Sequence, residues 1–369
     1  MVMKQLYKEI IEEKKRLEFN MTEGEILNKL VHDAHKLSNE TKQLFRILDN
    51  AVKSILDTLP SYFIVKNTNA SSFSHTAIGI DGSFQVIGGM GGIWYVPLSS
   101  VRIVFKNGLD RDVDSKYFAT IRKIEAIDES QAKKYASYLM LYLESSEIRT
   151  IADEKISDSN IFLDGPIIDP PFMVDNPYVD PREYTSYRTS AIYEVLKNGN
   201  RVLGCVKRIR DRKLIEHISQ EFPELNSMLN KFHNDLYLIA TMFKFYRFKL
   251  NPNYVGPLST MLTEEIPQNE IELKYSEKGI KIYYLFYQRN ARSPILRIEI
   301  ATKSQLTQEE LNDVIEVLNY WTIPGHGLPI PALLAHEKCT IREGCAQVLY
   351  EEIITKESAT SPIFNLWIR

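Results

Sequence analysis

Cysteine is scarce in this sequence, and no two cysteines are close together. Only three of the 369 residues are cysteine, at Cys205, Cys339 and Cys345, and no CxxC pair occurs. This argues against a disulfide framework and against a zinc finger, and it is typical of the reducing cytoplasm, where we place the protein. His336 and Cys339 could supply two zinc ligands, but no second pair completes a site of four ligands.

Long apolar runs and a strong net charge are also missing. No stretch of about 18 apolar residues occurs, and residues 1–19 are too charged for a signal peptide, so we expect neither a membrane span nor a secretion signal. The net charge of −3 excludes a simple polycation, and any contact with nucleic acid must therefore come from local basic patches. We expect a soluble intracellular protein.

The sequence has no phosphate-binding loop, although it contains a glycine-rich segment. Gly88, Gly89, Gly91 and Gly92 are followed by the apolar run 93–96, which is typical of a β-strand. A loop that holds phosphate is instead followed by the N-terminus of a helix. The segment therefore predicts a hairpin-like turn, and a P-loop is excluded.

The first 58 residues predict a helical arm. Residues 4–19 and about 22–58 have helical character, and apolar residues recur at helical spacing along the second segment. A stripe of this kind is most often a surface for packing or for dimer contacts. We assign residues 1–58 to this arm and residues 59–369 to a second domain.

From about residue 60 the pattern changes to short apolar runs, which later alternate with helical segments. Strands are predicted over 62–65, 75–80, 84–87, 93–96, 101–105, 160–163, 201–206, 282–287 and 295–300. Helices are predicted over 129–152, 182–197, 306–320 and 331–354, with a helical insertion around 211–246. A strand meander followed by alternating strands and helices predicts an α/β fold, in which helices flank both faces of a mixed sheet.

Two of the predicted strands end in an aspartate that is followed by glycine. Asp81 follows the apolar run 76–80, and Asp164 follows the run 160–163. An unpaired carboxylate at the end of a buried strand is costly to desolvate, and ligands of open α/β sheets bind beyond the carboxyl ends of strands. The two aspartates are therefore predicted to converge on one cation site. Taken singly, each could instead be an ordinary turn former.

Helices supply the other candidate ligands. Glu144 and Glu147 are three residues apart and lie near one face of the helix before Asp164, and Glu147 is near the end of its apolar stripe, where it can reach the sheet. His336 is on a later apolar helix. Taken singly, Glu147 is more often a solvated charge and His336 is often a core histidine. Together, carboxylates and one imidazole suit Mn²⁺ or Mg²⁺, and two such ions would clamp a phosphodiester during its hydrolysis.

Cations are concentrated in two short segments. Lys207, Arg208 and Arg210 follow the strand predicted over 201–206, where they could grip the phosphate backbone of DNA or form a solvated cationic face. The segment 244–249 alternates cations with aromatic residues, a pattern that suits stacking on unpaired bases and also a half-buried helix or strand. Both segments are candidate contacts to nucleic acid.

In their order along the chain, these motifs resemble those of the NurA family of archaeal and bacterial nucleases. They are Ile80-Asp81-Gly82-Ser83, Glu147, Leu163-Asp164-Gly165, Gly204-Cys205-Val206-Lys207-Arg208, and Pro329-Ile330-Pro331 through His336. The spacing from Glu147 to Asp164 matches the family better than that from Glu144, and the resemblance covers about residues 75–350. Phe84 departs from the pattern, because a basic or small residue is expected after Asp-Gly-Ser.

The resemblance implies an RNase H-like fold, a homodimer and Mn²⁺-dependent cleavage of single- and double-stranded DNA. It also implies 5′→3′ exonuclease and single-strand endonuclease activities in DNA end resection for homologous recombination, together with a hexameric translocase of the HerA type. Carried over to this sequence, the metal ligands and catalytic residues would be Asp81, Glu147, Asp164 and His336, with Asp81 as the bridging carboxylate. Lys207 would contact phosphate.

Two other classes of protein stay open on the sequence. Actin-like ATPases and sugar kinases also place an Asp-Gly turn after their first strand, but the second phosphate hairpin and the late Gly-Gly motif that they need are missing. A non-catalytic adaptor of a DNA translocase would keep the fold and lose the chemistry, and the intact acids argue against it. If the protein is a nuclease, Glu147→Ala is expected to impair cleavage more than Glu144→Ala.

Overall fold

The computed structural model describes residues 23–61, 63–66, 76–109, 113–168, 176–251 and 253–358. The chain divides into two units: one comprises Met1–Leu59 and Leu214–His233, and the other comprises Pro60–Lys213 and Asn234–Arg369. The helix predicted over 4–19 lies outside the described residues, and the division into domains 1–58 and 59–369 stays a prediction. No helix in the described ranges is both long and apolar enough to cross a lipid bilayer.

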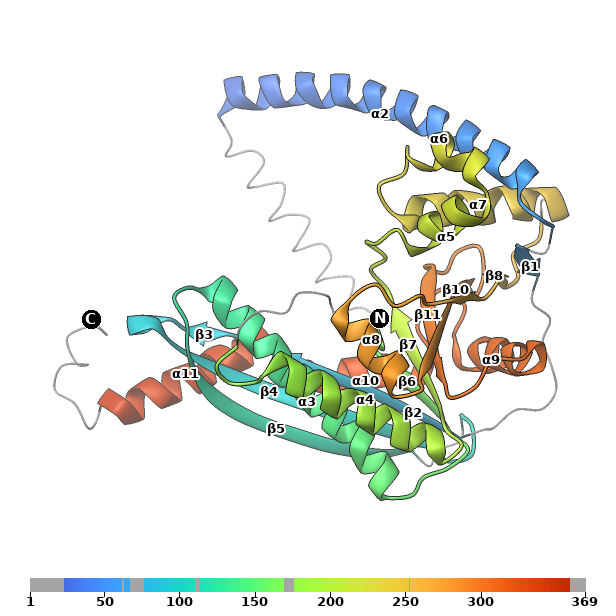
Figure 1. Ribbon diagram of the computed structural model, residues 1–369. Helices are drawn as coiled ribbons and strands as arrows, with labels where there is room; N and C mark the ends of the chain where they lie inside the picture. Colours follow the sequence, from blue (N-terminus) through green and yellow to red (C-terminus); the bar gives the residue numbers. More distant parts are fainter. Residues whose placement is uncertain are drawn as a thin grey trace. The chain divides into compact units, whose positions relative to one another are not determined.

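The described part of the first unit contains helices. They are α2 (Gly24–Thr58), α5 (Lys213–Glu221), η2 (Pro223–Leu225) and α6 (Asn226–Leu229). The predicted apolar stripe runs along α2, the long helix of Figure 1. Towards the C-terminal end of α2 the stripe is buried, at Leu48, Val52 and Ile55, and α2 contacts α6. Towards the N-terminal end, Ile26 and Leu30 are exposed.

One mixed sheet of eleven strands runs through the described part of the second unit (Figure 1). Its strands are β1 (Ile64–Lys66), β2 (Ala77–Phe84), β3 (Ile87–Gly88), β4 (Ile93–Phe105), β5 (Val113–Glu125), β6 (Asn160–Leu163), β7 (Arg201–Val206), β8 (Leu258–Thr260), β9 (Thr263–Glu264), β10 (Lys281–Gln288) and β11 (Leu296–Thr302). The order is β1-β8-β10-β11-β7-β6-β2-β4-β3, with β5 beside β4 and β9 beside β10. Strand β6 is parallel to β2 and to β7, whereas β4 and β11 continue the sheet in antiparallel pairing, which confirms the predicted mixed sheet.

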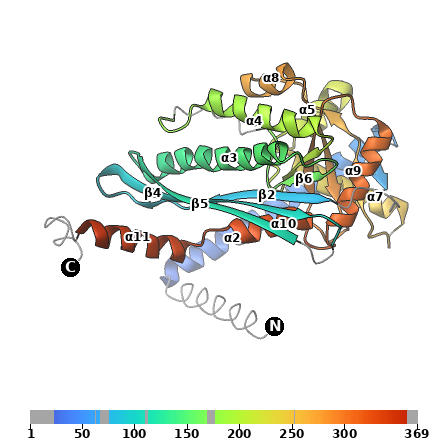
Figure 2. The same ribbon diagram turned by 90° about the horizontal axis from the view of Figure 1, so that it is seen from below.

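Helices cover both faces of this sheet. The first face carries α3 (Glu129–Asp153), α4 (Pro181–Lys197) and α8 (Glu270–Glu277), and the second carries α9 (Gln308–Trp321) and α10 (Ile330–Cys339). Figure 2 shows α3 and α4 on one side of β2 and α10 on the other. Because side chains alternate along a strand, Ile78 and Ile80 of β2 pack with the first set of helices and Ala77 packs with the second. The predicted α/β class with an RNase H-like sheet is confirmed.

The two helices on the first face begin at capping residues. Asp128 precedes α3, and its side chain accepts a hydrogen bond from the backbone N–H of Gln131 at 2.8 Å. Asp180 precedes α4 and accepts from the N–H of Arg182 at 2.8 Å, with Pro181 at the first helical position. Such caps satisfy N–H groups that have no partner inside the helix. They define where the helices that carry site residues begin.

The observed elements differ from the predicted ones chiefly at β4 and β5. The runs predicted over 93–96 and 101–105 belong to one strand, β4, which pairs along its whole length with β5. The apolar pattern does not predict β5, because most of its residues on both faces are exposed and no alternation results. The glycine-rich segment forms the predicted turn, with Gly89 at φ 99°. The region 331–354 is two helices, α10 and α11 (Glu343–Ser358).

Candidate metal centre

Two adjacent parallel strands bring Asp81 and Asp164 to the same edge of the sheet. Ile80 of β2 pairs with Leu163 of β6, and the backbone N–H of Asp164 donates to the carbonyl oxygen of Ile80 at 3.1 Å. Strand β6 ends at Leu163, whereas β2 continues to Phe84. Both aspartates therefore lie where the pairing of β2 with β6 stops. Asp164 lies directly after the end of β6, as predicted, but the predicted strand end at Asp81 is wrong, because Asp81 pairs with Val101 of β4 inside β2.

His336 reaches the two aspartates from α10. This helix approaches β2 so closely that a Cβ at Gly79 would lie 2.0 Å from the carbonyl oxygen of Pro331, a separation that only glycine permits. Nδ1 of His336 lies 2.9 Å from Oδ2 of Asp81 and 2.9 Å from Oδ2 of Asp164. Within the described ranges, one ligand atom from each of these three residues lies within 4.8 Å of the other two. The His336 side chain is 49% exposed, whereas the side chains of Asp81 and Asp164 are 7% and 2% exposed.

Protein donors satisfy only part of this acidic group. The N–H of Gly82 donates to Oδ1 of Asp81 at 2.9 Å, and the Cys339 thiol donates to Oδ2 at 3.1 Å. Nζ of Lys207 lies 2.7 Å from Oδ2 of Asp164, whereas Oδ1 of Asp164 is buried and has no hydrogen-bond partner. A buried carboxylate oxygen without a donor is costly, and a divalent cation would satisfy it. Two carboxylates and one imidazole form a donor set that fits Mn²⁺ or Mg²⁺.

The electrostatics of the group are those of two carboxylates placed together in a poorly hydrated position. Burial, and after it the proximity of Asp164, raises the pKa of Asp81 to about 7. Burial and the neighbouring Asp81 also raise the pKa of the Cys339 thiol, which therefore stays a protonated donor. Because the protein compensates the ionised form of Asp81 poorly, a bound cation would stabilise that form.

Glu147, the predicted fourth ligand, lies apart from this group. Its Oε2 is 3.5 Å from Nε of Arg102, a buried side chain of β4. Nη2 of Arg102 lies 2.9 Å from Oε1 of Glu154, so the guanidinium joins two glutamates of this region. Burial raises the pKa of Glu147, and Arg102 opposes that shift. The structure brings Asp81, Asp164 and His336 together and leaves Glu147 with a cationic partner of its own.

Glu144, one helical turn before Glu147 on α3, lies beside the acidic group. A Cβ at Gly82 would be 3.0 Å from Oε1 of Glu144. The Glu144 side chain is buried, and its negative charge helps to raise the pKa of the Cys339 thiol. Oε2 of Glu144 is 3.8 Å from Nη1 of Arg188. The structure therefore favours Glu144 over Glu147 as the glutamate of this site.

The predicted phosphate contacts lie on the turn after β7. Lys207 follows Val206, the last residue of the strand, and its ammonium forms an ion pair with Asp164 of the acidic group. Arg208 and Arg210 are exposed, while Ile209 between them is 2% exposed. The buried isoleucine anchors the turn, and both arginines are accessible to a ligand.

The second cationic segment, 244–249, belongs to the helix α7 (Asp235–Leu250). Arg247 is buried, and it donates to Oε1 of Gln288 at 2.5 Å and to the carbonyl oxygen of Gly256 at 3.0 Å. Phe248 is 72% exposed. The half-buried helix, which was one of the two alternatives for this pattern, accounts for Arg247.

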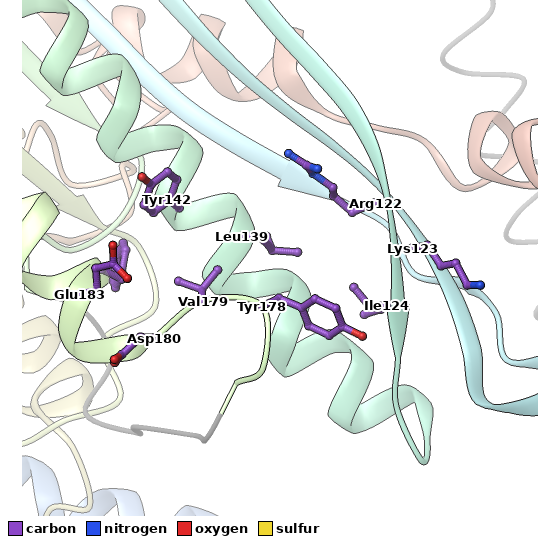
Figure 3. Close-up of a pocket in the computed structure, with 10 residues that line it drawn as sticks. Arg122, Lys123, Ile124, Leu139, Tyr142, Tyr178, Val179, Asp180 and Glu183 are labelled. Carbon is purple, nitrogen blue, oxygen red and sulfur yellow. The ribbon is translucent and has the colours of Figure 1, made fainter.

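A pocket of 460 Å³ lies between β5, α3 and the start of α4 (Figure 3). Tyr142 of α3, Tyr178 and Arg122 line it, together with the carboxylates of Asp180 and Glu183. None of the three residues of the acidic group lines this pocket. Its charges are mixed in sign, and we assign it no role in the chemistry of the site.

Three residues around the site were not identified as such from the sequence. Cys339 is one helical turn after His336, and this spacing could have indicated that both face the same aspartate. Arg102 interrupts the apolar run 101–105, which could have marked a buried charge with a partner. Arg188 lies in a helix of mixed composition and has no comparable signal.

The sheet and the carboxylate–imidazole group define an α/β protein of RNase H-like architecture with a candidate site for a divalent metal ion. The family model of the NurA domain matches residues 75–341. The chain therefore belongs to the NurA family, which confirms the resemblance of the sequence motifs. A search of curated protein sequences found no match.

Two solved structures of NurA proteins share the fold. The crystal structure of the NurA nuclease from Sulfolobus solfataricus is similar with a TM-score of 0.62 at 13% identity, over 92% of this chain and 99% of that one. Another NurA crystal structure has a TM-score of 0.52 at 10% identity, over 91% and 98% of the two chains. A structure of NurA bound to dAMP and manganese has a TM-score of 0.42 at 13% identity, over 87% and 94%.

Proposed function

We propose that this protein is a metal-dependent nuclease that hydrolyses the phosphodiester bonds of DNA. The observation that carries the proposal is the convergence of Asp81, Asp164 and His336, whose ligand atoms lie within 4.8 Å of one another where the pairing of β2 with β6 stops. Membership of the NurA family supports the proposal, as does the fold shared with a NurA nuclease. The exposed cations after β7 supply a surface for the phosphate backbone.

The metal in this proposal is Mn²⁺, with Mg²⁺ as the alternative, and the site would hold two ions. Asp81, Asp164 and His336 would hold the metal, and Glu144 rather than Glu147 would add the further carboxylate. The imidazole favours Mn²⁺, because Mg²⁺ prefers oxygen ligands alone. The bound metal would supply Lewis-acid activation of water and would neutralise charge on the phosphate.

The protein side chains have separate tasks in this proposal. Asp81 would be the bridging carboxylate that the family resemblance implies. The N–H of Gly82 donates to its Oδ1 at 2.9 Å, and its Oδ2 lies 2.9 Å from Nδ1 of His336. The Lys207 side chain is 39% exposed, so its ammonium can exchange the carboxylate of Asp164 for a phosphate oxygen. Arg208 and Arg210, which are exposed, would contact the backbone further along the strand.

The wider biology in this proposal rests on the family resemblance. It comprises a homodimer in the cytoplasm, 5′→3′ exonuclease and single-strand endonuclease activities, and work in DNA end resection for homologous recombination. The partner would be a hexameric translocase of the HerA type, which feeds duplex DNA to the nuclease. These activities predict substrates with free ends and single-stranded regions.

The test is a cleavage assay on linear, end-labelled single- and double-stranded DNA. Cleavage with Mn²⁺ that EDTA stops, and that Asp81→Asn abolishes, is the expected result. Asp313→Asn is the matched control, because Asp313 is a half-exposed acid that pairs with Arg201 on the protein surface, and it should keep full activity. A folded protein that cleaves neither substrate with any divalent ion contradicts the proposal and favours the translocase adaptor.

A further inference from the structure

A buried arginine connects the elements that carry the acidic residues. Arg188 of α4 is 1% exposed. Its Nε donates to the carbonyl oxygen of Ile167 at 3.1 Å, and its Nη2 donates to that of Pro166 at 3.1 Å. Its Nη1 donates to Oγ of Ser145 at 3.2 Å. Each of the three guanidinium nitrogens therefore donates a hydrogen bond, and two of the three acceptors are backbone carbonyl oxygens.

The contacts of Arg188 lead to both sides of the metal centre. Pro166 and Ile167 belong to the loop that directly follows Asp164, and Ser145 is the neighbour of Glu144 on α3. Oε2 of Glu144 itself lies 3.8 Å from Nη1. One planar side chain thus spans the distance from the loop after Asp164 to the acidic turn of α3.

Strand pairing does not control this distance. Strand β6 ends at Leu163, one residue before Asp164, and Glu144 belongs to a helix on one face of the sheet. Other anchors hold the loop without involving α3: the Tyr275 hydroxyl donates to the carbonyl oxygen of Ile167 at 2.8 Å, and the N–H of Ile167 donates to Glu299 at 2.7 Å. Arg188 differs from these anchors because it also binds the helix.

The second buried arginine of this region makes contacts of another kind. Arg102 is also 1% exposed, but its ion pairs go to the side chains of Glu147 and Glu154. Glu144 and Glu147 of α3 thus pair with different arginines. Of the two, it is Arg188 whose guanidinium also donates to backbone carbonyl oxygens of the loop after Asp164. A buried arginine that fixes backbone acceptors orients the residues beside them.

We propose that Arg188 is a positioning residue that sets the separation between the carboxylates of Asp164 and Glu144, and with it the affinity of the site for Mn²⁺. This inference rests on the metal site proposed above. The guanidinium is suited to the task because it is flat and reaches three acceptors at fixed angles. The single ammonium of a lysine cannot reach all of them.

The test measures Mn²⁺ binding without DNA, by electron paramagnetic resonance of free Mn²⁺, in Arg188→Lys and the wild type. Groups that support metal ligands typically change metal affinity about 10–100-fold when they are mutated. We expect a dissociation constant for Mn²⁺ at least about tenfold higher in Arg188→Lys. At saturating Mn²⁺ the KM for DNA should stay close to that of the wild type, because Arg188 is buried and does not meet substrate.

Arg247→Lys is the matched control. Arg247 is also a buried arginine that donates to a backbone carbonyl, that of Gly256, and it has no contact with the acidic group. It should lose stability without losing Mn²⁺ affinity, and circular dichroism should show that both variants are folded. An equal loss of Mn²⁺ affinity in both lysine variants would show a general packing effect and would overturn the inference.

Ser145→Ala keeps the inference testable if Arg188→Lys does not fold. It leaves the guanidinium, its loop contacts and its ion pair with Glu144 in place, and it deletes the hydrogen bond to Ser145 of α3. We expect Mn²⁺ binding a few-fold weaker than in the wild type, on the order of two- to fivefold, since one of the orienting contacts is lost. If the variant that folds binds Mn²⁺ as tightly as the wild type, the positioning role of Arg188 is overturned and the proposed function is not. A wild type that neither binds Mn²⁺ nor cleaves DNA overturns the proposed function as well.

Discussion

Nε of Arg102 lies 3.5 Å from Oε2 of Glu147, so the glutamate predicted as a metal ligand already has a cationic partner. Glu144 also has an arginine partner, since its Oε2 lies 3.8 Å from Nη1 of Arg188, but its Oε1 lies beside Gly82, the residue that follows Asp81. The two glutamates lie one turn apart on one helix, yet Glu144 lies beside the acidic group and Glu147 lies apart from it. We therefore expect mutation of the two glutamates to reduce DNA cleavage to different extents.

Glu144→Gln should reduce DNA cleavage more than Glu147→Gln, which reverses the expectation from sequence spacing. We expect about 10–100-fold lower kcat for Glu144→Gln, because a carboxylate beside the metal is lost, and a few-fold change on the order of fivefold or less for Glu147→Gln, which breaks a pair outside the group. Both variants are measured with Mn²⁺ on the same linear DNA. A larger loss in Glu147→Gln would return the ligand assignment to that residue.

Asp81→Asn should abolish cleavage and leave the protein folded. The amide keeps the shape of the side chain and removes the charge that a divalent cation requires. The metal-free variant should be at least as stable as the wild type, because burial and Asp164 disfavour the ionised carboxylate. Thermal unfolding in EDTA measures the stability, and retained cleavage would remove Asp81 from the metal site.

The stability of the metal-free protein should fall as pH rises through the range set by Asp81. The pKa of Asp81 is raised from 3.8 to about 7 in the folded protein, so between these values the folded state binds more protons than the unfolded state. The free energy of unfolding then decreases with rising pH, by up to about 1.4 kcal/mol per pH unit for one such group. Urea unfolding in EDTA at about pH 5 and about pH 7.5 measures it. Asp81→Asn should show a weaker pH dependence than the wild type, and equal dependence would contradict the assignment.

Gly79→Ala should destabilise the protein and weaken metal binding together. The added Cβ would lie 2.0 Å from the carbonyl oxygen of Pro331, so α10 must move away from β2 and take His336 with it. Overpacking of this kind costs about 1–3 kcal/mol or more. Gly344→Ala is the control, because a Cβ at this position in α11 meets no atom within 4 Å. Mn²⁺ titration and urea unfolding of both variants separate the two effects, and a neutral Gly79→Ala would disprove the close packing.

Lys207→Gln should weaken DNA binding and reduce its dependence on salt. A lysine that contacts one phosphate contributes about one unit to the slope of log affinity against log salt concentration. Lys281→Gln serves as the control, since Lys281 pairs with Glu264 on the surface, where both side chains are 43% exposed. Binding is measured with Ca²⁺ in place of Mn²⁺ to prevent cleavage. An unchanged salt slope in Lys207→Gln would place the phosphate contact elsewhere.

Much of the fold could be predicted because its signals are local. Strands β2 and β6 were predicted from short apolar runs that are followed by Asp-Gly, and the helix between them supplies the crossover that parallel strands require. Strand β5 could not be predicted in this way. Its residues are exposed on both faces, Tyr117 to 62%, and it is a strand because it pairs with β4 over its full length.

The sequence by itself determined the family, the mixed sheet and the two aspartates of the site, because an apolar run followed by a carboxylate can be recognised from consecutive residues. Only the tertiary structure decided which glutamate of α3 stands beside them. Glu144 and Glu147 lie near one helical face, and the spacing to Asp164 pointed to Glu147. Their surroundings come from Arg188 on α4 and Arg102 on β4. Such partners are distant in sequence, and packing alone brings them to the helix.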